Sequence, residues 1–274
     1  MQLVGLGVVK NEADVIEQSA RHALRFCDRI VYLDNGSTDG TWELLQGLAK
    51  DGGGRIVVAG QELGPFHDGL RGMIYDDLHG SMGDDDWWIQ IDADEFLEVD
   101  PRPAIRRAVA ARRNRIRTWQ AQFVFTDRDL EDWEAGRDDP ALPIQQRRRW
   151  YSADWRESRL WRNDPNRSWG DGDSTHPAWA DRPYPFALVN RHYQFRNPEQ
   201  MQRRIEDRRG LFPHVTSESW RQDVRPSAGL RNLDADGGRI RLDRRGFVRQ
   251  RAEIRLRARR VGGVARREPV SPSA

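Results

Sequence analysis

The stretch Trp87-Trp88-Ile89-Gln90-Ile91-Asp92-Ala93-Asp94-Glu95-Phe96-Leu97 joins a short apolar run to a cluster of carboxylates. Trp87 to Ile91 is typical of a buried β-strand because it is short, aromatic and β-branched. Asp92 and Asp94 are two positions apart, so in an extended chain their side chains point the same way. Two such carboxylates favour Mg²⁺ or Mn²⁺, which takes its other ligands from water and substrate phosphates. A lone D-x-D pair is more often a solvated acidic turn, so the prediction of a metal site needs support from the rest of the chain.

The chain that precedes this stretch alternates between apolar runs and helical patterns. Strands are predicted over residues 3–9, 29–33, 55–59 and 87–91, and helices over residues 15–24, 42–49 and 67–82. This order predicts an α/β fold with a mostly parallel central sheet and helices on both faces. Ligands of such sheets bind outside the carboxyl ends of the strands. Three polar clusters fall at those ends and strengthen the prediction of a site: Asn11-Glu12, Asp34 to Asp39, and Asp92 to Glu95.

The second half of the chain is less regular. Helices are predicted over residues 101–113 and 197–209, and strands over residues 117–126 and 186–195. Residues 127–143 are expected to form a mobile loop, and residues 163–185 a long loop of the kind that makes lids or binding loops. Residues 145–161 are dense in Arg and Trp, and the organisation weakens after residue 210.

Composition limits the class of protein. A chain of 274 residues suits one large domain or one domain with an extension. The net charge of +2 is too small to imply a nucleic-acid partner by itself. Cys27 is the single cysteine, so no internal disulfide forms, which fits a reducing cytoplasm. We expect a cytoplasmic protein, because the sequence shows neither a signal-peptide pattern nor an apolar segment that would span a bilayer.

Three segments together resemble glycosyltransferase family 2, which has the GT-A fold: Val8 to Glu12, Tyr32 to Thr41, and Ile91 to Phe96. Two more are similar to elements of the branch with a DADEF-type D-x-D motif: Ser158 to Arg162, and His192 to Met201. The resemblance implies a metal-dependent enzyme that moves a hexosyl or related sugar from a nucleoside diphosphate sugar to an acceptor hydroxyl with inversion. A UDP-sugar is the favoured donor. The acceptor, a glycan, a lipid-linked molecule or a small molecule, is not specified.

The resemblance also implies a division of the chain and roles for its strand ends. Residues 1–100 would form the half that binds the nucleotide sugar, residues 101–210 the acceptor half, and residues 211–274 an Arg-rich extension. Asn11 and Glu12 would lie by the base and ribose, and Asp34 would contact the nucleotide from the second strand. Asp39 would either contact the nucleotide or cap the helix that begins at Thr41.

The remaining donor-site residues surround the D-x-D pair. Asp92 would face the ribose and the metal, and Asp94 would bind Mn²⁺ or Mg²⁺ directly. Arg71 would either add positive charge at the diphosphate or be a solvated helix residue. His176 and His192 are candidates for a further metal ligand, although a single histidine is more often a hydrogen-bonded structural residue.

The chain departs from the related enzymes at the catalytic base. They often carry a His-Glu pair at the place where this sequence has Thr175-His176-Pro177. The nearest carboxylates are Asp171 and Asp173, in a Gly-containing loop that can approach a substrate closely. We predict Asp173 as the base ahead of Asp171, with Glu157 third, and the alternative is that both aspartates only solvate the loop.

Two other functions were compared with glycosyl transfer. A nucleotidyltransferase would use a similar sheet-edge site, but it would carry a Gly- and Arg/Lys-rich triphosphate loop after the first strand, and Lys10-Asn11-Glu12 is no such loop. An Arg-rich nucleic-acid-binding protein is suggested by residues 145–149 and by the C-terminal run, but no recognised nucleic-acid module accompanies them. We therefore expect no nucleic-acid partner.

The C-terminal run from Arg241 to Arg260 is predicted to form a surface helix. Its Ile254 and Leu256 would cover part of the catalytic domain or contact an anionic membrane surface, and the alternative is a solvated helix without a partner. The tail from Glu268 to Ala274 is expected to be disordered. The tryptophans between Trp150 and Trp179 suit either stacking on sugar rings or core packing.

Overall fold

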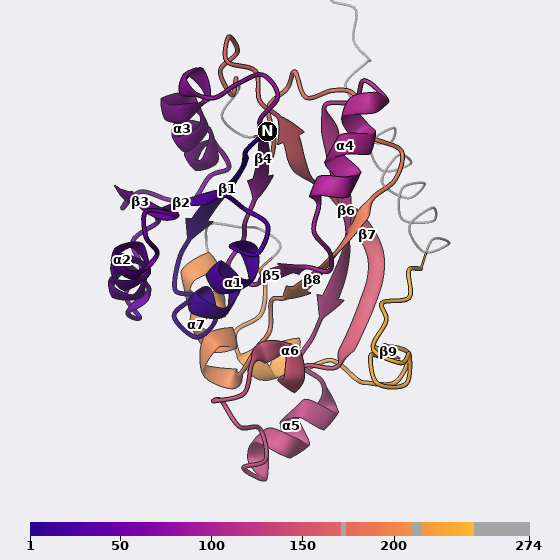
Figure 1. Cartoon of the computed structure of the whole chain (residues 1–274). Helices are drawn as coiled ribbons and strands as arrows, with labels where there is room; N and C mark the ends of the chain where they lie inside the picture. Colours follow the sequence, from indigo (N-terminus) through magenta and orange to yellow (C-terminus); the bar gives the residue numbers. More distant parts are fainter. Residues whose placement is uncertain (171–173, 210–214, 244–274) are drawn as a thin grey trace, which may run out of the picture.

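The computed structural model describes residues 1–170, 174–209 and 215–243. The first half contains the predicted alternation of strands and helices (Figure 1). Its elements are β1 (Leu3–Val9), α1 (Ile16–Ala23), β2 (Arg29–Asp34), α2 (Thr41–Asp51), β3 (Ile56–Gln61), α3 (Gly69–Leu78) and β4 (Trp87–Gln90). A short 3₁₀ turn, His79–Ser81, follows α3. Each strand and helix predicted for this half is confirmed, with ends that differ by a few residues.

The second half adds strands and short helices. They are β5 (Glu95–Leu97), α4 (Arg102–Ala110), β6 (Arg115–Phe123), α5 (Asp127–Glu134), α6 (Ile144–Arg147), β7 (Trp150–Arg162), β8 (Leu188–Tyr193), α7 (Pro198–Arg208), a 3₁₀ turn (Trp220–Asp223) and β9 (Arg231–Asn232). The predicted elements over residues 101–126 and 186–209 are confirmed. Among the described residues, no helix has the length and apolar character needed to cross a membrane.

All of these strands belong to one sheet. Its order is β3-β2-β1-β4-β7-β6-β8-β5, with β9 paired to β7. The pairs β1–β2, β2–β3, β1–β4 and β6–β8 are parallel. The pairs β4–β7, β6–β7 and β5–β8 are antiparallel. The α/β class and the parallel sheet of the first half are confirmed, and β7 joins that half to the mixed second half.

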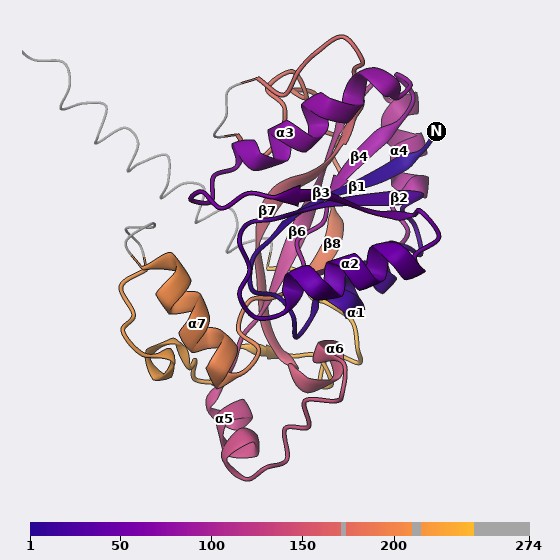
Figure 2. The same cartoon turned by 90° about the vertical axis from the view of Figure 1, so that its left-hand side faces the viewer.

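Helices cover both faces of the parallel half, as predicted. Figure 2 shows α3 on one side of β1, and α1 and α2 on the other. Leu3 packs in the apolar layer under α1 and α2, whereas its neighbour Val4 packs in the layer under α3. Gly7 makes room for groups of the flanking strands, because a Cβ there would lie 2.6 Å from the Tyr32 ring on β2 and 2.8 Å from the Ile91 carbonyl oxygen just after β4.

The prediction of a mobile loop over residues 127–143 is wrong. Helix α5 begins there with a capping box, in which Asp129 Oδ2 accepts from Thr126 N at 2.8 Å and Thr126 Oγ1 accepts from Asp129 N at 3.3 Å. The end of the segment is tied to the core by the buried Arg148, whose Nη2 atom lies 2.6 Å from Asp138 Oδ2. Asp129 belongs to the capping box of α5, and Asp138 forms an ion pair with Arg148. The acidic composition of the segment therefore wrongly indicated a loop.

The Arg- and Trp-rich residues 145–161 mostly form β7, which lies antiparallel to β6 and β4. The long segment over residues 163–185 lacks helices and strands in its described part, as predicted. It is nevertheless anchored, because Trp169 is buried and Trp88 Nε1 donates to Asn163 Oδ1 at 2.8 Å. Trp161 and Trp169 therefore belong to the core, which decides for these two between sugar stacking and packing.

A buried ion pair joins β7 to the strand that follows the D-x-D pair. Arg159 on β7 contacts both carboxylate oxygens of Glu95 on β5, with Nε–Oε2 at 2.9 Å and Nη2–Oε1 at 2.5 Å. Asn190 on β8 donates to Glu95 Oε2 at 2.5 Å. The Glu95 side chain is only 4% exposed, so its charge depends on these partners.

We expect Arg159→Met to lower the free energy of unfolding by about 3–5 kcal/mol, because it leaves the buried Glu95 carboxylate without its cation. The matched control is Arg162→Met on the same strand, because Arg162 pairs with Asp85 at the surface. The control is expected to cost less than about 1 kcal/mol. Urea unfolding of the full chain measures both, and equal losses in the two variants would contradict the assignment.

Candidate functional site

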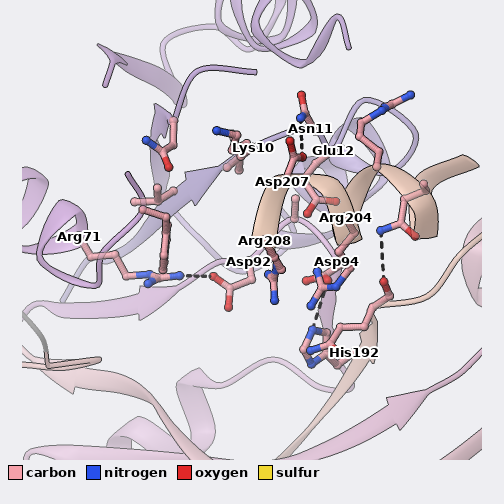
Figure 3. A pocket seen from close by; sticks show the side chains of 18 residues that line it. Lys10, Asn11, Glu12, Arg71, Asp92, Asp94, His192, Arg204, Asp207 and Arg208 are labelled. Atoms are coloured by element: carbon pink, nitrogen blue, oxygen red, sulfur yellow. Dashed lines mark hydrogen bonds and ion pairs between the residues drawn. The ribbon is translucent and has the colours of Figure 1, made fainter. Parts of the chain in front are cut away.

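A cavity of about 250 Å³ lies outside the carboxyl ends of β1, β2 and β4. The end of β1 and the residues after it form one wall, and the turn that carries Asp92 and Asp94 forms the floor (Figure 3). Helix α7 closes the other side with Arg203, Arg204, Asp207 and Arg208. The cavity thus sits where a parallel sheet is expected to bind its ligand.

Most of the predicted donor-site residues meet at this cavity although they lie far apart in the sequence. Those that line it are Asn11, Glu12, Arg71, Asp92, Asp94 and His192. They come from the end of β1, from α3, from the turn after β4 and from β8. The polar clusters predicted that three strand ends meet at one edge of the sheet, and the structure confirms that residues after β1, β2 and β4 line the same cavity.

Asp34 and Asp39 do not line the cavity. Asp34 is fully buried and accepts hydrogen bonds from Ser37 N and Gln61 Nε2, both at 3.0 Å. Asp39 accepts from Thr41 N at 3.0 Å and so holds the start of α2, which is the structural alternative named for it. Both carboxylates shape the loop after β2, and Asn35 is the residue of that loop that lines the cavity.

His176 lies away from this cavity, which corrects its prediction as a metal ligand. Its Nε2 atom contacts Nη1 of Arg115. In the sheet, Arg115 on β6 lies opposite Trp161 on β7, and Trp161 lies opposite Trp88 near the start of β4. Asp92 follows the other end of β4, so His176 and the D-x-D pair lie at opposite ends of that strand. Burial and the neighbouring Arg115 lower the pKa of His176 to about 4. Asp171 and Asp173 lie outside the described residues.

Asp92 is held by two arginines. Arg71 Nη2 lies 2.8 Å from Oδ1, and Arg159 Nη2 lies 3.2 Å from Oδ2. Gln90 Nε2 donates to Oδ2 at 3.0 Å. Burial by itself would raise the pKa of Asp92, but Arg71 and Arg159 outweigh it and hold the pKa below its usual value. Arg71 is therefore a partner of the D-x-D pair and not a solvated helix residue.

Asp94 is held differently, by a histidine and a more distant arginine. His192 Nε2 lies 3.2 Å from Oδ2 of Asp94, and Arg196 Nη1 lies 3.8 Å from the same oxygen. Burial opposes ionisation of Asp94, but His192 and Arg196 outweigh it and lower its pKa. Burial opposes the charged form of His192 as well, yet Asp94 and Glu95 raise its pKa. Asp94 and His192 thus each favour the charged form of the other.

Arg196 also organises the loop after β1. Its Nη2 atom lies 2.5 Å from Glu12 Oε2, and its Nε atom lies 2.8 Å from Asp14 Oδ2. Arg196 itself is fully buried. Burial raises the pKa of Glu12 to about 7 although Arg196 opposes the shift. One buried arginine from the segment before α7 thus fixes the carboxylates at the end of β1.

Asn11 links the loop after β2 to α7. Its backbone has a φ of 54°, in the left-handed region that asparagine tolerates better than most residues. Its Oδ1 atom accepts from Thr38 N at 2.8 Å, and its Nδ2 atom donates to Asp207 Oδ2 at 2.7 Å. Both ends of the amide are thereby used to fix the wall of the cavity.

Four residues that carry much of this arrangement were not singled out from the sequence: Arg159, Arg196, Arg204 and Asp207. Arg159 and Arg196 lie inside motifs that were quoted only for their family resemblance. The α7 residues carry a clearer signal, because the residues of this helix that line the cavity repeat at helical spacing over positions 200, 203, 204, 207 and 208. A polar stripe of that kind on a helix, opposite a cluster of carboxylates, could have identified the wall.

The residues at the D-x-D turn fit a divalent cation only if a bound substrate and water supply most of its ligands. No group of three or more His, Cys, Asp or Glu suited to holding a metal occurs in the part of the chain that the structure describes. Asp92 uses both of its oxygens for arginines and Gln90, whereas the Asp94 contacts to His192 and Arg196 engage only Oδ2. Asp94 Oδ1 is thus the oxygen that could bind Mg²⁺ or Mn²⁺, with phosphates and water completing the shell.

Comparison with known proteins gives one sequence match and distant structural likenesses. The family model "Glycosyl transferase family 2" matches residues 8–67. No curated protein matches the sequence. The structure of TarS residues 1–349 from S. aureus is 11% identical, with a TM-score of 0.41, over 76% of this chain and 65% of that one. A mannosyltransferase from Pyrobaculum calidifontis in complex with GDP-Man and Mn²⁺ is 14% identical, with a TM-score of 0.42, over 75% of this chain and 61% of that one.

The chain spans less than two thirds of the length of either structure, and likenesses this distant carry no argument about activity, substrate or metal. The family match is more specific, because it begins in β1, runs through β2 and β3, and ends two residues before α3. It therefore covers Asn11, Glu12 and Asn35 at the cavity. The match covers less than a quarter of the chain, and it shows that the segment with these strand ends resembles glycosyltransferase family 2.

Proposed function

We propose that the cavity binds a nucleoside diphosphate sugar, with a UDP-sugar as the first candidate, and that the enzyme transfers the sugar to an acceptor hydroxyl with inversion. The observation that carries the proposal is the meeting of Asn11, Glu12, Asp92 and Asp94 with the cations of α7 at one cavity. A nucleoside diphosphate needs polar partners for its base and ribose and positive charge for its phosphates, and the two sides of the cavity offer these separately.

The nucleoside half of the donor is assigned to the loops after β1 and β2. Asn11 and Glu12 are proposed for the ribose and base, as the family resemblance implies. Asn35 is added, because it lines the cavity and its buried Oδ1 atom has no hydrogen-bond partner among the described residues. Its Nδ2 atom is already used, since it donates to the carbonyl oxygen of Glu62 at 2.7 Å. An N–H group of a base would satisfy Oδ1.

The D-x-D pair is proposed to divide its work between the two carboxylates. Asp94 would hold Mn²⁺ or Mg²⁺ through Oδ1, and His192, which lies against Asp94, is the remaining candidate for a further ligand. Asp92, fixed by Arg71 and Arg159, would orient toward the ribose and metal. When bound, the ion supplies Lewis-acid charge to the leaving diphosphate.

Inversion requires a carboxylate that takes the acceptor proton as the acceptor oxygen bonds to the anomeric carbon and the bond to the diphosphate breaks. Asp173 is proposed for this role ahead of Asp171. Glu157 is the third candidate and lies on β7, with Oε2 at 2.6 Å from Arg159 Nη2 and Oε1 accepting from Trp155 Nε1 at 2.7 Å. Its side chain is 35% exposed, so it stays accessible although it does not line the donor cavity.

The division of the chain into donor, acceptor and C-terminal parts stays a prediction, as do the DADEF-type branch and a cytoplasmic location. The proposed membrane contact concerns residues 241–260, which lie outside the described residues from residue 244 onward. Co-sedimentation with anionic and neutral vesicles would separate a membrane contact from a solvated helix.

The donor proposal is tested with a panel of UDP- and GDP-sugars in the presence of Mn²⁺. We expect at least one of them to raise the melting temperature of the protein. We also expect it to be hydrolysed slowly, with release of the nucleoside diphosphate, because water can take the place of the acceptor hydroxyl when no acceptor is bound. Omission of the metal is expected to reduce both effects. A panel without any shift or hydrolysis would count against a nucleotide-sugar donor.

For the base, we expect Asp173→Asn to lower kcat by about a hundredfold or more with donor affinity nearly unchanged, because the loss falls on the transition state. The matched control is Asp171→Asn in the same loop, which is expected to do much less. Turnover and donor affinity are measured for both variants. Near-normal turnover of Asp173→Asn would move the assignment to Glu157 or remove base-assisted inversion altogether.

A further inference from the structure

Arg204 differs from four other arginines at or near the cavity. Arg71, Arg159, Arg196 and Arg203 each form an ion pair with a carboxylate. Arg204 forms none within residues 1–170, 174–209 and 215–243, although its half-buried side chain lines the cavity (Figure 3). The contact that it makes is with an aromatic ring, since its guanidinium carbon lies 5.7 Å from the centroid of Phe195.

The position is costly for a cation. Burial and the like charge of Arg208 lower the pKa of Arg204 to about 10, and Asp94 and Glu12 only partly oppose the shift. A guanidinium removed from water needs hydrogen-bond acceptors in return. Among the described residues Arg204 has no ion-pair partner that would supply such acceptors, and it lies on α7 at the side of the cavity that faces the D-x-D turn.

The nearby carboxylates are committed to other partners. Asp94 Oδ2 contacts His192, Glu12 Oε2 contacts Arg196, and Asp207 Oδ2 accepts from Asn11. Each of these contacts fixes the wall of the cavity through one carboxylate oxygen, and none of the three carboxylates forms an ion pair with Arg204 in the part of the chain that the structure describes. An incoming anion would be the ion-pair partner that Arg204 lacks.

Helix α7 is held rigidly enough to present a fixed charge. Asn197 caps its start by accepting from Gln200 N at 2.8 Å. Further along, Arg203 pairs with Asp39 at 3.1 Å and Asp207 with Asn11 at 2.7 Å, so the helix is tied to the loops after β2 and β1. Arg204 lies between these two ties, and its backbone position is therefore fixed before a ligand arrives.

We propose that Arg204 is the protein's own ligand for the diphosphate of the donor, and that it faces those phosphates from α7 while the D-x-D pair faces them from the sheet. The inference rests on the proposed nucleotide-sugar function. The planar guanidinium suits phosphate oxygens, with which it forms charge-assisted and often paired hydrogen bonds. It would add to the metal on the opposite side and would act also when the metal is absent.

The test compares nucleoside diphosphates with their nucleosides, so that the phosphates are isolated from the base and ribose. Calorimetric titrations use UDP, GDP, uridine and guanosine, each with Mn²⁺ and with EDTA. Arg204→Met keeps an unbranched apolar side chain and removes the guanidinium, with its charge and its contact to the Phe195 ring. We expect it to weaken binding of the nucleoside diphosphate at least about tenfold and to leave the nucleoside unchanged. The affinity of Arg204→Lys for the nucleoside diphosphate is expected to lie between those of the wild type and Arg204→Met, because lysine keeps the charge but not the planar guanidinium.

The matched control is Arg209→Met, which removes a charge from an exposed residue just after α7. It should bind like the wild type, and thermal melting checks that all variants are folded. Unchanged diphosphate affinity in Arg204→Met, or an equal loss for diphosphate and nucleoside, would overturn the inference while the proposed function stands. A wild-type protein that binds neither UDP nor GDP would overturn the proposed function and this inference with it.

Discussion

The ion pair between Arg159 and Glu95 is the interaction on which the site depends. It lies under the D-x-D turn, where β5, β7 and β8 meet, and Arg159 reaches from it to Asp92 at 3.2 Å. Several carboxylates are buried within a few residues of one another here, and they would repel without buried cations. The antiparallel return of β7 beside β4 supplies the main cation, so the sheet topology and the charge balance of the site are one constraint.

The same balance explains why the two aspartates of the D-x-D pair are not equivalent. Asp92 has an arginine on each of its carboxylate oxygens, whereas Asp94 contacts His192 through Oδ2. The carboxylate of Asp92 is therefore occupied by the protein's own ion pairs, and Oδ1 of Asp94 is the oxygen proposed to bind a metal ion. Opposite them, α7 carries Arg204, which forms no ion pair among the described residues. The proposed ligand would place its negative charge between the sheet and the helix.

The sequence predicted the parallel half and its ligand edge well, because alternating βα units leave little choice of where strand ends lie. Asn11, Asp92 and Asp94 were found for that reason. It could not place His176, because the loop after β7 has no periodicity and returns to the start of β4. It missed Arg159 and Arg196, because partners more than sixty residues away decide whether an arginine is surface or core. The acidic segment at residue 127 misled in the same way, since its acidic residues serve a capping box and ion pairs.

We propose above that the D-x-D cavity is a metal-assisted nucleoside diphosphate site in which Asp94 binds the metal. The decisive measurement is calorimetric titration of the wild type and of Asp94→Asn with UDP and GDP, with and without Mn²⁺. We expect Mn²⁺ to strengthen nucleoside diphosphate binding in the wild type and to have no such effect in the folded Asp94→Asn variant. Metal-dependent binding of equal strength in the two proteins would show that Asp94 does not bind the metal.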